Sequence, residues 1–281
     1  MKKNSKLQKI VIFIMVIMIT AAIIPGRTVL VKASSTGDPV LGQISLFPYG
    51  SAPYGWVECD GRTMLRLQNQ ALYSLIGTTF GGNGTTNFNL PNLSSKAPVT
   101  GTKYYMATVG MYGVDSAMPA IGEVCLFPDS MVPGTSSMWK LCDGSLLSTV
   151  QYPGLFSLLG INYGGNGSTN FNIPNLSTKN PISGVHYYIA LDGTFPTDMG
   201  IQNDALLGSI ELYAFSTIPG GAYYCNGQTI PTYNNDALYS LIGTTFGGDG
   251  SNFGIPNMVL KVPSSKMKYC MRSIGLYPSF Y

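Results

Sequence analysis

Few side chains in this sequence are of the types that carry out acid–base or nucleophilic chemistry. The one histidine, His186, lies on an expected strand beside Tyr187 and Tyr188. At the corresponding places elsewhere in the chain we expect Tyr104 and Tyr269. A histidine whose counterparts are tyrosines is better explained as a structural or surface residue than as a general base. The sequence therefore predicts no catalytic residue at this position.

Paired carboxylates could hydrolyse glycosides, since that reaction needs two acidic side chains flanking the bond. Asp60 and Asp143 occupy equivalent positions, but the third equivalent residue is Asn226. Glu58 is likewise replaced, by Leu141 and Tyr224. Each of the first three residues precedes a glycine, and Asp-Gly and Asn-Gly are dipeptides of tight turns. Turn geometry explains these residues better than catalysis, and we expect no enzyme.

Cofactor and metal motifs are also weak. The loop 81–88 resembles a calcium-binding glycine-rich nonapeptide, which works only as consecutive repeats. Here it occurs singly, with Thr86 in place of the ligand aspartate and Asp249 as the one carboxylate in an equivalent loop. No Cys/His cluster has zinc spacing, and no Gly-Lys-Ser/Thr follows the glycines as in a phosphate-binding loop. We expect no metal and no cofactor.

The N-terminal segment 1–33 differs from the rest of the chain. Lysines precede an apolar run from Ile10 to Ile24, and Val31-Lys32-Ala33 is typical of a cleavage site. This pattern predicts a secretory signal peptide, with a retained membrane anchor as the alternative. All six charges of the segment are basic, so the remainder carries 10 Lys and Arg against 13 Asp and Glu. That balance gives no basic footprint for nucleic acid.

Five cysteines are an odd number for an exported protein. Cys59, Cys142 and Cys225 occupy one position of a repeat, whereas Cys125 and Cys270 are additional. If their strands are neighbours, disulfides Cys125–Cys142 and Cys225–Cys270 would leave Cys59 over. The alternative is that all five are small buried apolar residues.

The positions of these residues follow from a long repeat. Gly61, Gly144 and Gly227 are separated by 83 residues each. Solenoid repeats run to roughly 50 residues, so each copy is a small domain. The predicted division is a signal peptide at 1–33 and modules at 34–115, 116–200 and 201–281. A module of this size buries only about 60–65% of its surface, so contacts between modules or chains should add stability.

Within one module, alternating residues predict strands at 43–47 and 56–59, read together as a hairpin. A two-turn helix begins near Asn69 and ends at Gly77, and the glycine-rich stretch after it has little predicted regular structure. A further strand begins at Lys103. The fold class is therefore mainly β with one short helix per module, as three tandem α+β modules.

The motifs of the first copy together resemble the phage tail collar domain, which also occurs in bacterial microcystin-dependent proteins. They are Trp-x-x-Cys-Asp-Gly at 56–61, the block at 71–84 and Phe-Asn-Leu-Pro-Asn-Leu at 88–93. The third copy departs in lacking the tryptophan, and the chain has no shaft sequence. The resemblance implies a structural or adhesive role like that of trimeric tail fibres, without catalytic residues. Three copies on one chain would mimic the trimer internally or polymerise into a filament.

Tyrosines are the candidate contact residues, because they combine an apolar face with a polar tip. We expect one member of each adjacent pair to face outward. The candidates are Tyr104, Tyr105, Tyr187, Tyr188 and Tyr281. The apolar C-terminus, 275–281, should dock into its own module or a neighbouring subunit.

The sequence thus predicts a secreted, non-enzymatic structural or adhesive protein of the bacterial cell surface that self-associates into an oligomer or appendage. The alternative is a lectin-like module that binds a surface glycan. Nucleic acid is not an expected partner, and a membrane is one only through an uncleaved N-terminus.

Overall fold

The computed structural model describes residues 39–112, 119–129, 131, 138–196 and 205–280. The predicted signal peptide lies outside these residues. The segment from Ser35 to Tyr281 forms one compact unit. Of the helices in the described ranges, none is both long and apolar enough to cross a bilayer.

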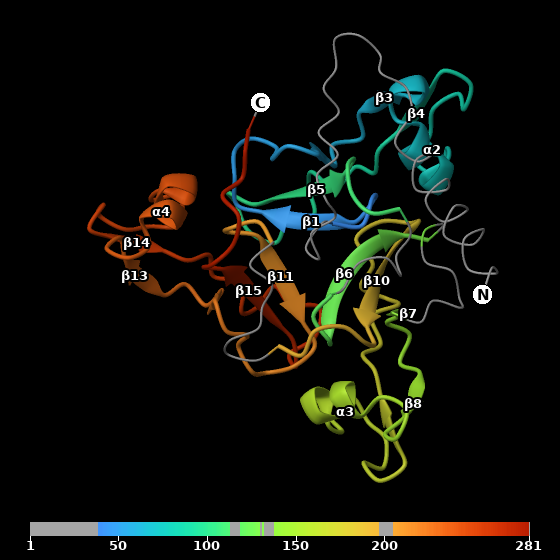
Figure 1. The fold of residues 1–281 in the computed structure, drawn as a ribbon, viewed down its shortest axis with the longest axis vertical. Helices are drawn as coiled ribbons and strands as arrows, with labels where there is room; N and C mark the ends of the chain where they lie inside the picture. The colour runs from blue at the N-terminus through green and yellow to red at the C-terminus, as the bar shows by residue number, and fades with distance from the viewer. Residues whose placement is uncertain (1–38, 113–118, 130, 132–137, 197–204, 281) are drawn as a thin grey trace, which may run out of the picture. The chain divides into compact units, whose positions relative to one another are not determined.

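Each module repeats one order of elements (Figure 1). The first module contains β1 (Ile44–Phe47), β2 (Trp56–Glu58), β3 (Thr63–Leu65), η1 (Arg66–Gln68), α2 (Gln70–Ile76), β4 (Asn87–Asn89) and β5 (Lys103–Ala107). The second contains β6 (Glu123–Pro128), β7 (Trp139–Leu141), β8 (Leu146–Ser148), α3 (Pro153–Leu159), β9 (Asn170–Asn172) and β10 (Val185–Ala190). The third contains β11 (Ile210–Tyr213), β12 (Ala222–Tyr224), β13 (Thr229–Pro231), α4 (Asp236–Ile242), β14 (Asn252–Gly254) and β15 (Lys268–Arg272).

The short helices follow the sequence prediction. In α2, Leu72 and Ile76 are buried one turn apart. Gly77 ends the helix at φ 54, a backbone angle that residues with a Cβ rarely adopt. The equivalent glycines end α3 and α4 at φ 53 and 51. Each helix lies with one small two-stranded sheet in a lobe that extends from the central strands, as Figure 1 shows.

The central sheet differs from the predicted hairpin. β1 and β2 do not pair with each other, because β5 lies between them and pairs with both. The second and third modules repeat this order, with β10 between β6 and β7 and with β15 between β11 and β12. Nearly all of β5 is buried, which suits a central strand and not an edge. The hairpin prediction is wrong because the eight residues between β1 and β2 form an open loop and not a tight turn.

The first strands of the three modules close a ring of pairings. Each strand pairs through a leucine with a residue near the start of the next strand, in the cyclic order of modules one, three and two. The pairs are Leu46 with Ile210, Leu212 with Val124, and Leu126 with Ile44. These contacts join strands of all three modules into one nine-stranded sheet. The modules are therefore not separate beads, and the chain builds an approximate threefold arrangement by itself.

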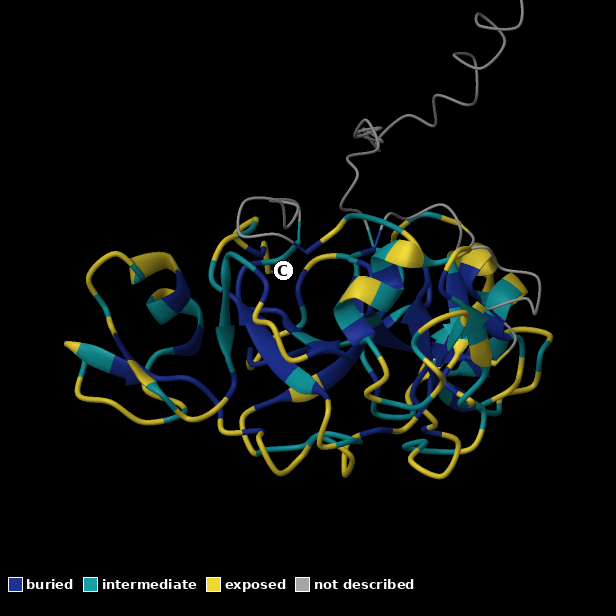
Figure 2. Cartoon of the chain, turned by 90° about the horizontal axis from the view of Figure 1, so that it is seen from below, coloured by how far each residue is buried: buried dark blue, intermediate teal, exposed yellow. Residues whose placement is uncertain are grey.

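The buried residues follow this arrangement. Figure 2 shows the central strands in the colour of buried residues, while exposed residues gather on the lobes and outer loops. In the first two modules a tryptophan packs edge-on against a phenylalanine of the first strand. The ring centroids of Phe47 and Trp56 lie 4.9 Å apart, and those of Phe127 and Trp139 lie 5.1 Å apart. The fold is mainly β with one short helix per module, as predicted. The boundaries at 115 and 200 stay a prediction, since the modules share one sheet.

Candidate functional site where the three modules meet

Three equivalent tyrosines meet where the modules join. Tyr104, Tyr187 and Tyr269 are paired with the equivalent leucines of β1, β6 and β11, which are Leu46, Leu126 and Leu212. The side chains of all three line one small cavity at this junction. Burial raises the pKa of all three phenols, that of Tyr187 to about 12. They therefore stay protonated near neutral pH, and as buried side chains from all three modules they fill the junction.

The predicted contact tyrosines are thus placed differently from the expectation. Tyr104, Tyr105, Tyr187 and Tyr188 are all buried, so the idea that one of each pair faces outward is wrong. The reason is that β5 and β10 are covered on both faces once the modules associate. Tyr281 lies outside the described residues.

A glycine at the start of each module receives a side chain from its neighbour. These glycines have φ between 80 and 84. A Cβ would lie 2.5 Å from Met131 Sδ at Gly42, 2.9 Å from Phe215 Cδ1 at Gly122 and 3.1 Å from Tyr49 Cε1 at Gly208. The same cyclic order appears, because each contributing side chain comes from the module that supplies the leucine of the strand pair. Positive φ and close approach both require glycine at these positions. The repeated opening glycine was the sequence signal for these junctions.

A polar network crosses the same junctions. Arg272 Nε donates to Glu211 Oε1 at 2.7 Å, and the Tyr213 hydroxyl donates to Glu211 Oε2 at 2.5 Å. Both side chains of the Arg272–Glu211 pair are largely buried, and a buried charge needs such a partner. The pair belongs to the third module alone, since the residues equivalent to Arg272 are alanines.

Glu123 is the second carboxylate of the network. Its Oε1 accepts from Cys125 Sγ at 3.2 Å and its Oε2 from the backbone N–H of Ala120 at 3.3 Å. Burial, reinforced by the charge of Glu211, raises the pKa of Glu123 to about 7. The thiol of Cys125 also accepts from Gln43 Nε2 of the first module at 3.5 Å.

The network differs at every equivalent position. Glu123 corresponds to Gln43 and Ser209, and Glu211 corresponds to Ser45 and Cys125. In three identical chains the residue at each position would face two copies of itself, and three copies of Glu123 would repel. Here each module supplies a different group, so the junctions fit three distinct modules in a set order.

The space between these residues is too small for a substrate. A cavity of about 40 Å³ lies among the first strands and the three tyrosines, bordered also by Glu123 and Glu211. Ligand pockets usually measure about 300–1,000 Å³, whereas one water occupies about 30 Å³. The carboxylates therefore act on other residues of the junction and have no room for a reacting molecule. No group of three or more metal-ligating side chains occurs in the described ranges.

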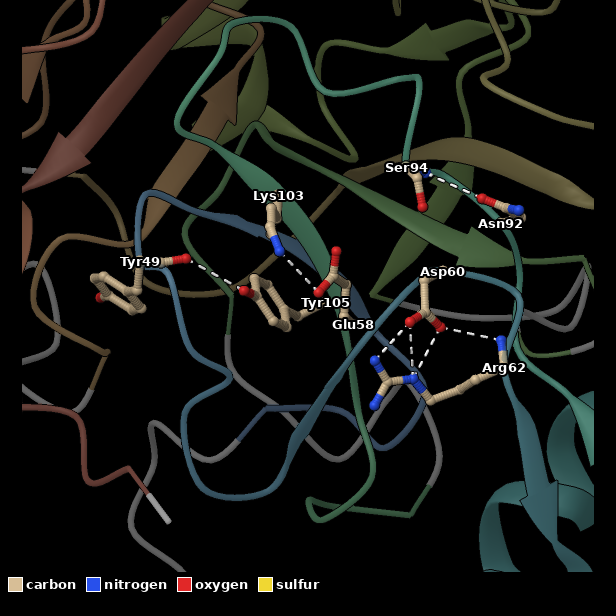
Figure 3. Close-up of polar contacts among 8 residues, drawn as sticks. All are labelled: Tyr49, Glu58, Asp60, Arg62, Asn92, Ser94, Lys103 and Tyr105. Carbon is tan, nitrogen blue, oxygen red and sulfur yellow. Dashed lines mark hydrogen bonds and ion pairs between the residues drawn. The ribbon is translucent and has the colours of Figure 1, made fainter. Parts of the chain in front are cut away.

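Turn geometry explains the acidic residues after β2. The side-chain oxygens of Asp60, Asp143 and Asn226 each accept from the backbone N–H two residues later, at 2.9–3.1 Å. Arg62 also binds Asp60 with Nε at 2.8 Å (Figure 3), and this hydrogen bond is the largest cause of the lowered pKa of Asp60. An asparagine oxygen does the same structural work as a carboxylate.

The surface of the first module carries a second ion pair in Figure 3. Lys103 Nζ donates to Glu58 Oε2 at 3.0 Å, and Tyr105 donates to the carbonyl of Tyr49 at 3.2 Å. In the third module the equivalent contact is Lys268 over the Tyr224 ring, 4.8 Å from its centroid. The lysine is present in both modules, and its partner changes from a carboxylate to an aromatic ring.

The glycine-rich loop is organised by its central side chain. Asn83 Oδ1 accepts backbone N–H groups of three following residues at 2.9–3.1 Å. Asn166 repeats this set in the second module, and Asp249 accepts two such bonds in the third. The oxygen that a metal would use is engaged by the loop itself. Asp249 is therefore explained by the loop backbone.

His186 does not correspond to Tyr104 and Tyr269. It is paired with Phe127, as Lys103 is with Phe47, so its counterparts are lysines. Its Nδ1 contacts Asp129, which directly follows β6. The correspondence was misassigned by one residue, and His186 lies in a polar contact at the surface.

The five cysteines are free and buried. Cys125 and Cys142 are not brought onto neighbouring strands, because β10 lies between β6 and β7. Two strand spacings of about 4.8 Å exceed the usual Cα separation of a disulfide. Cys225 does follow a strand that pairs with the strand of Cys270. Burial raises the pKa of Cys59 and of the other four thiols, which makes them poor nucleophiles.

The C-terminal segment docks as expected within its own module, where Leu276 pairs with Leu206. It then continues to the first module, where the backbone N–H of Tyr54 donates to the carbonyl of Ser279 at 2.8 Å. This second contact was not predicted.

Comparison with known proteins agrees with the repeat. The family model of the phage tail collar domain matches residues 42–98, 122–181 and 208–263, one match in each module and more than half of the chain in total. No curated protein and no solved structure is significantly similar to the chain. The three matches show that this chain belongs to the phage tail collar domain family, a family of tail-type structural proteins, and carries the domain in three tandem copies.

Proposed function

We propose that this chain is a secreted, non-enzymatic structural and adhesive protein that places a complete collar trimer on the bacterial cell surface as one polypeptide. The cyclic pairing of β1, β6 and β11 is the observation that carries the proposal. In this proposal the three modules of one chain take the places that three separate collar chains would take in a trimer. The family's structural role and the filled junctions both support a protein without catalysis.

Further self-association would then use the lobes. Between the first lobe strand and the helix of each module one equivalent apolar side chain is exposed, with exposed fractions of 81% for Leu67, 86% for Val150 and 79% for Tyr233. The recurrence of an exposed apolar group on all three modules supports the proposal that these positions contact other copies of the protein. The edge strands are less suited to this, because β2, β7 and β12 are only three residues long.

The test is the size of the secreted protein. The full chain is produced in a bacterium, recovered from the medium or cell surface, and analysed by N-terminal sequencing, light scattering and electron microscopy. We expect an N-terminus near residue 34 and ordered oligomers that the variant L67S/V150S/Y233S no longer forms. Retention in the cytoplasm, or the same mass for both proteins, would contradict secretion or lobe-driven assembly respectively.

A lectin-like role is the second candidate, and it now depends on other aromatic residues. Tyr112, Phe195 and Tyr277 are equivalent and lie 59%, 41% and 56% exposed. The Tyr112 and Tyr277 hydroxyls hydrogen-bond to serines of α2 and α4 at 2.9 Å. An exposed ring beside hydroxyl groups suits a sugar face. A glycan array with the wild type and a variant in which all three residues are alanine tests this role. Equal signals from the two proteins would contradict it.

A further inference from the structure

The C-terminal residues cross from the third module to the first. Leu276 pairs with Leu206, and the Tyr277 hydroxyl hydrogen-bonds to Ser240, both within the third module. The next residues leave that module, and Phe280 pairs with Pro53 in the loop after β1. In Figure 1 the red C-terminal trace runs beside the blue segment that follows β1.

Phe280 contacts the side chain that joins the first module to the third. Its ring lies 5.7 Å from that of Tyr49, at 84°. Tyr49 in turn packs on Gly208 and donates its hydroxyl to the carbonyl of Leu207. The ring of Tyr49 therefore lies between Gly208 of the third module and Phe280 near the C-terminus.

This junction differs from the other two in connectivity. The first and second modules are continuous in sequence, and so are the second and third. The third and first modules meet only through side-chain and strand contacts, among them the pairing of Leu46 with Ile210. A junction without a covalent connection can open while the chain stays intact, and the C-terminal contacts add to the strand and side-chain contacts that oppose this opening.

We propose that residues 278–280 are a clasp that keeps the junction between the third and first modules closed. When the clasp is released, the third module of one chain docks onto the first module of a second copy of this chain. The occupant is a second copy because the two freed surfaces, Tyr49 with Leu46 on one side and Gly208 with Ile210 on the other, are complementary to each other. Repeating this head-to-tail contact without closure gives a linear polymer, whereas closure between two chains gives a swapped dimer.

The experiment removes the clasp from a chain whose lobes do not associate. In the background L67S/V150S/Y233S, one variant ends after Tyr277 and a second carries Phe280→Ala. Tyr277→Phe is the matched control, since it removes a hydroxyl contact within the third module and leaves the clasp in place. Two differently tagged copies of each protein are mixed, and co-purification and mass are followed over time and concentration.

Loss of the clasp should raise the rate of exchange by about tenfold, the factor that corresponds to about 1.4 kcal/mol. Dimers and larger species should grow with concentration in both clasp variants, while the Tyr277→Phe control stays monomeric. A parent chain that exchanges as fast as the variants would overturn the proposal, and so would folded clasp variants that remain monomeric. Near-ultraviolet circular dichroism establishes folding, and Phe280→Ala replaces the truncation if the shortened chain unfolds. Because the lobes are inactivated in every sample, failure here leaves lobe-driven assembly untouched.

Discussion

Replacing Glu123 by glutamine should stabilise the protein in a pH-dependent way. Because folding raises the pKa of this carboxyl from 4.5 to about 7, the folded chain binds its proton more tightly than the unfolded chain between these values. Stability therefore falls as the pH rises from 4.5 to about 7, and the loss is complete above that range. Glutamine cannot ionise, so the variant avoids the loss.

The size of the effect follows from the shift. A change of about 2.5 pKa units corresponds to about 3 kcal/mol as an upper limit. Glu123 is only partly buried and its charge attracts Arg272, so we expect a gain of about 1–3 kcal/mol above pH 7. At about 2–4 °C per kcal/mol for a chain of this size, the melting temperature should rise by roughly 2–12 °C.

The chain already contains the replacement. At the equivalent position of the first module, Gln43 Oε1 accepts from the backbone N–H of Val40 at 3.2 Å, as Glu123 does from Ala120. Melting temperatures by circular dichroism at pH 4.5 and above pH 7 give the comparison. Glu58→Gln, the same chemical change at a surface ion pair, serves as the control. The reasoning is refuted if Glu123→Gln is less stable than the wild type above pH 7, or if its gain is the same at both pH values.

Three further substitutions test other parts of the structure. Glu211→Gln removes the carboxylate that binds the buried Arg272. It should lower the free energy of unfolding by about 3–5 kcal/mol in urea titrations, and an effect below 1 kcal/mol would contradict this. Gly82→Ala places a Cβ 2.4 Å from the backbone of β4 at a φ of 97, so it should lower the free energy of unfolding by more than 1 kcal/mol. Gly50→Ala is the control, because the space around Gly50 is open, and it should change the melting temperature little. Asn83→Ala leaves three backbone N–H groups without their acceptor, so it should lower the free energy of unfolding by about 1–3 kcal/mol. Asn83→Asp, which introduces the residue of the third module, should retain most of the stability, and a loss as large as that of alanine would contradict the role of the side-chain oxygen.

Local features of the fold could be predicted because they depend on few residues. The helix that ends at Gly77 and the turn at Asp60 follow from the preferences of neighbouring side chains. Gly81 and Gly247, which occupy equivalent places in the glycine-rich loops, both have a φ of 107, a value that favours glycine. Repetition of the same residue types in three copies strengthened each of these inferences.

Long-range pairings could not be predicted in the same way. Whether β1 pairs with β2 or with β5 depends on which strand is covered on both faces, and strand preference is set by this context. The pairing of β3 with β4 was missed because a stretch with asparagine, proline and glycine resembles a loop. The exposure of Tyr104 and Tyr187 was misjudged because the covering surface comes from other modules.

The ring of pairings also changes how the assembly responds to dilution. Three separate chains dissociate when their concentration falls below the value that sustains association, because their stability depends on mass action. Modules on one polypeptide remain at a fixed effective concentration whatever the volume around them. Leu46 and Ile210 meet by a first-order closure, in a ratio of one to one that synthesis guarantees. A single molecule therefore carries the complete threefold structure.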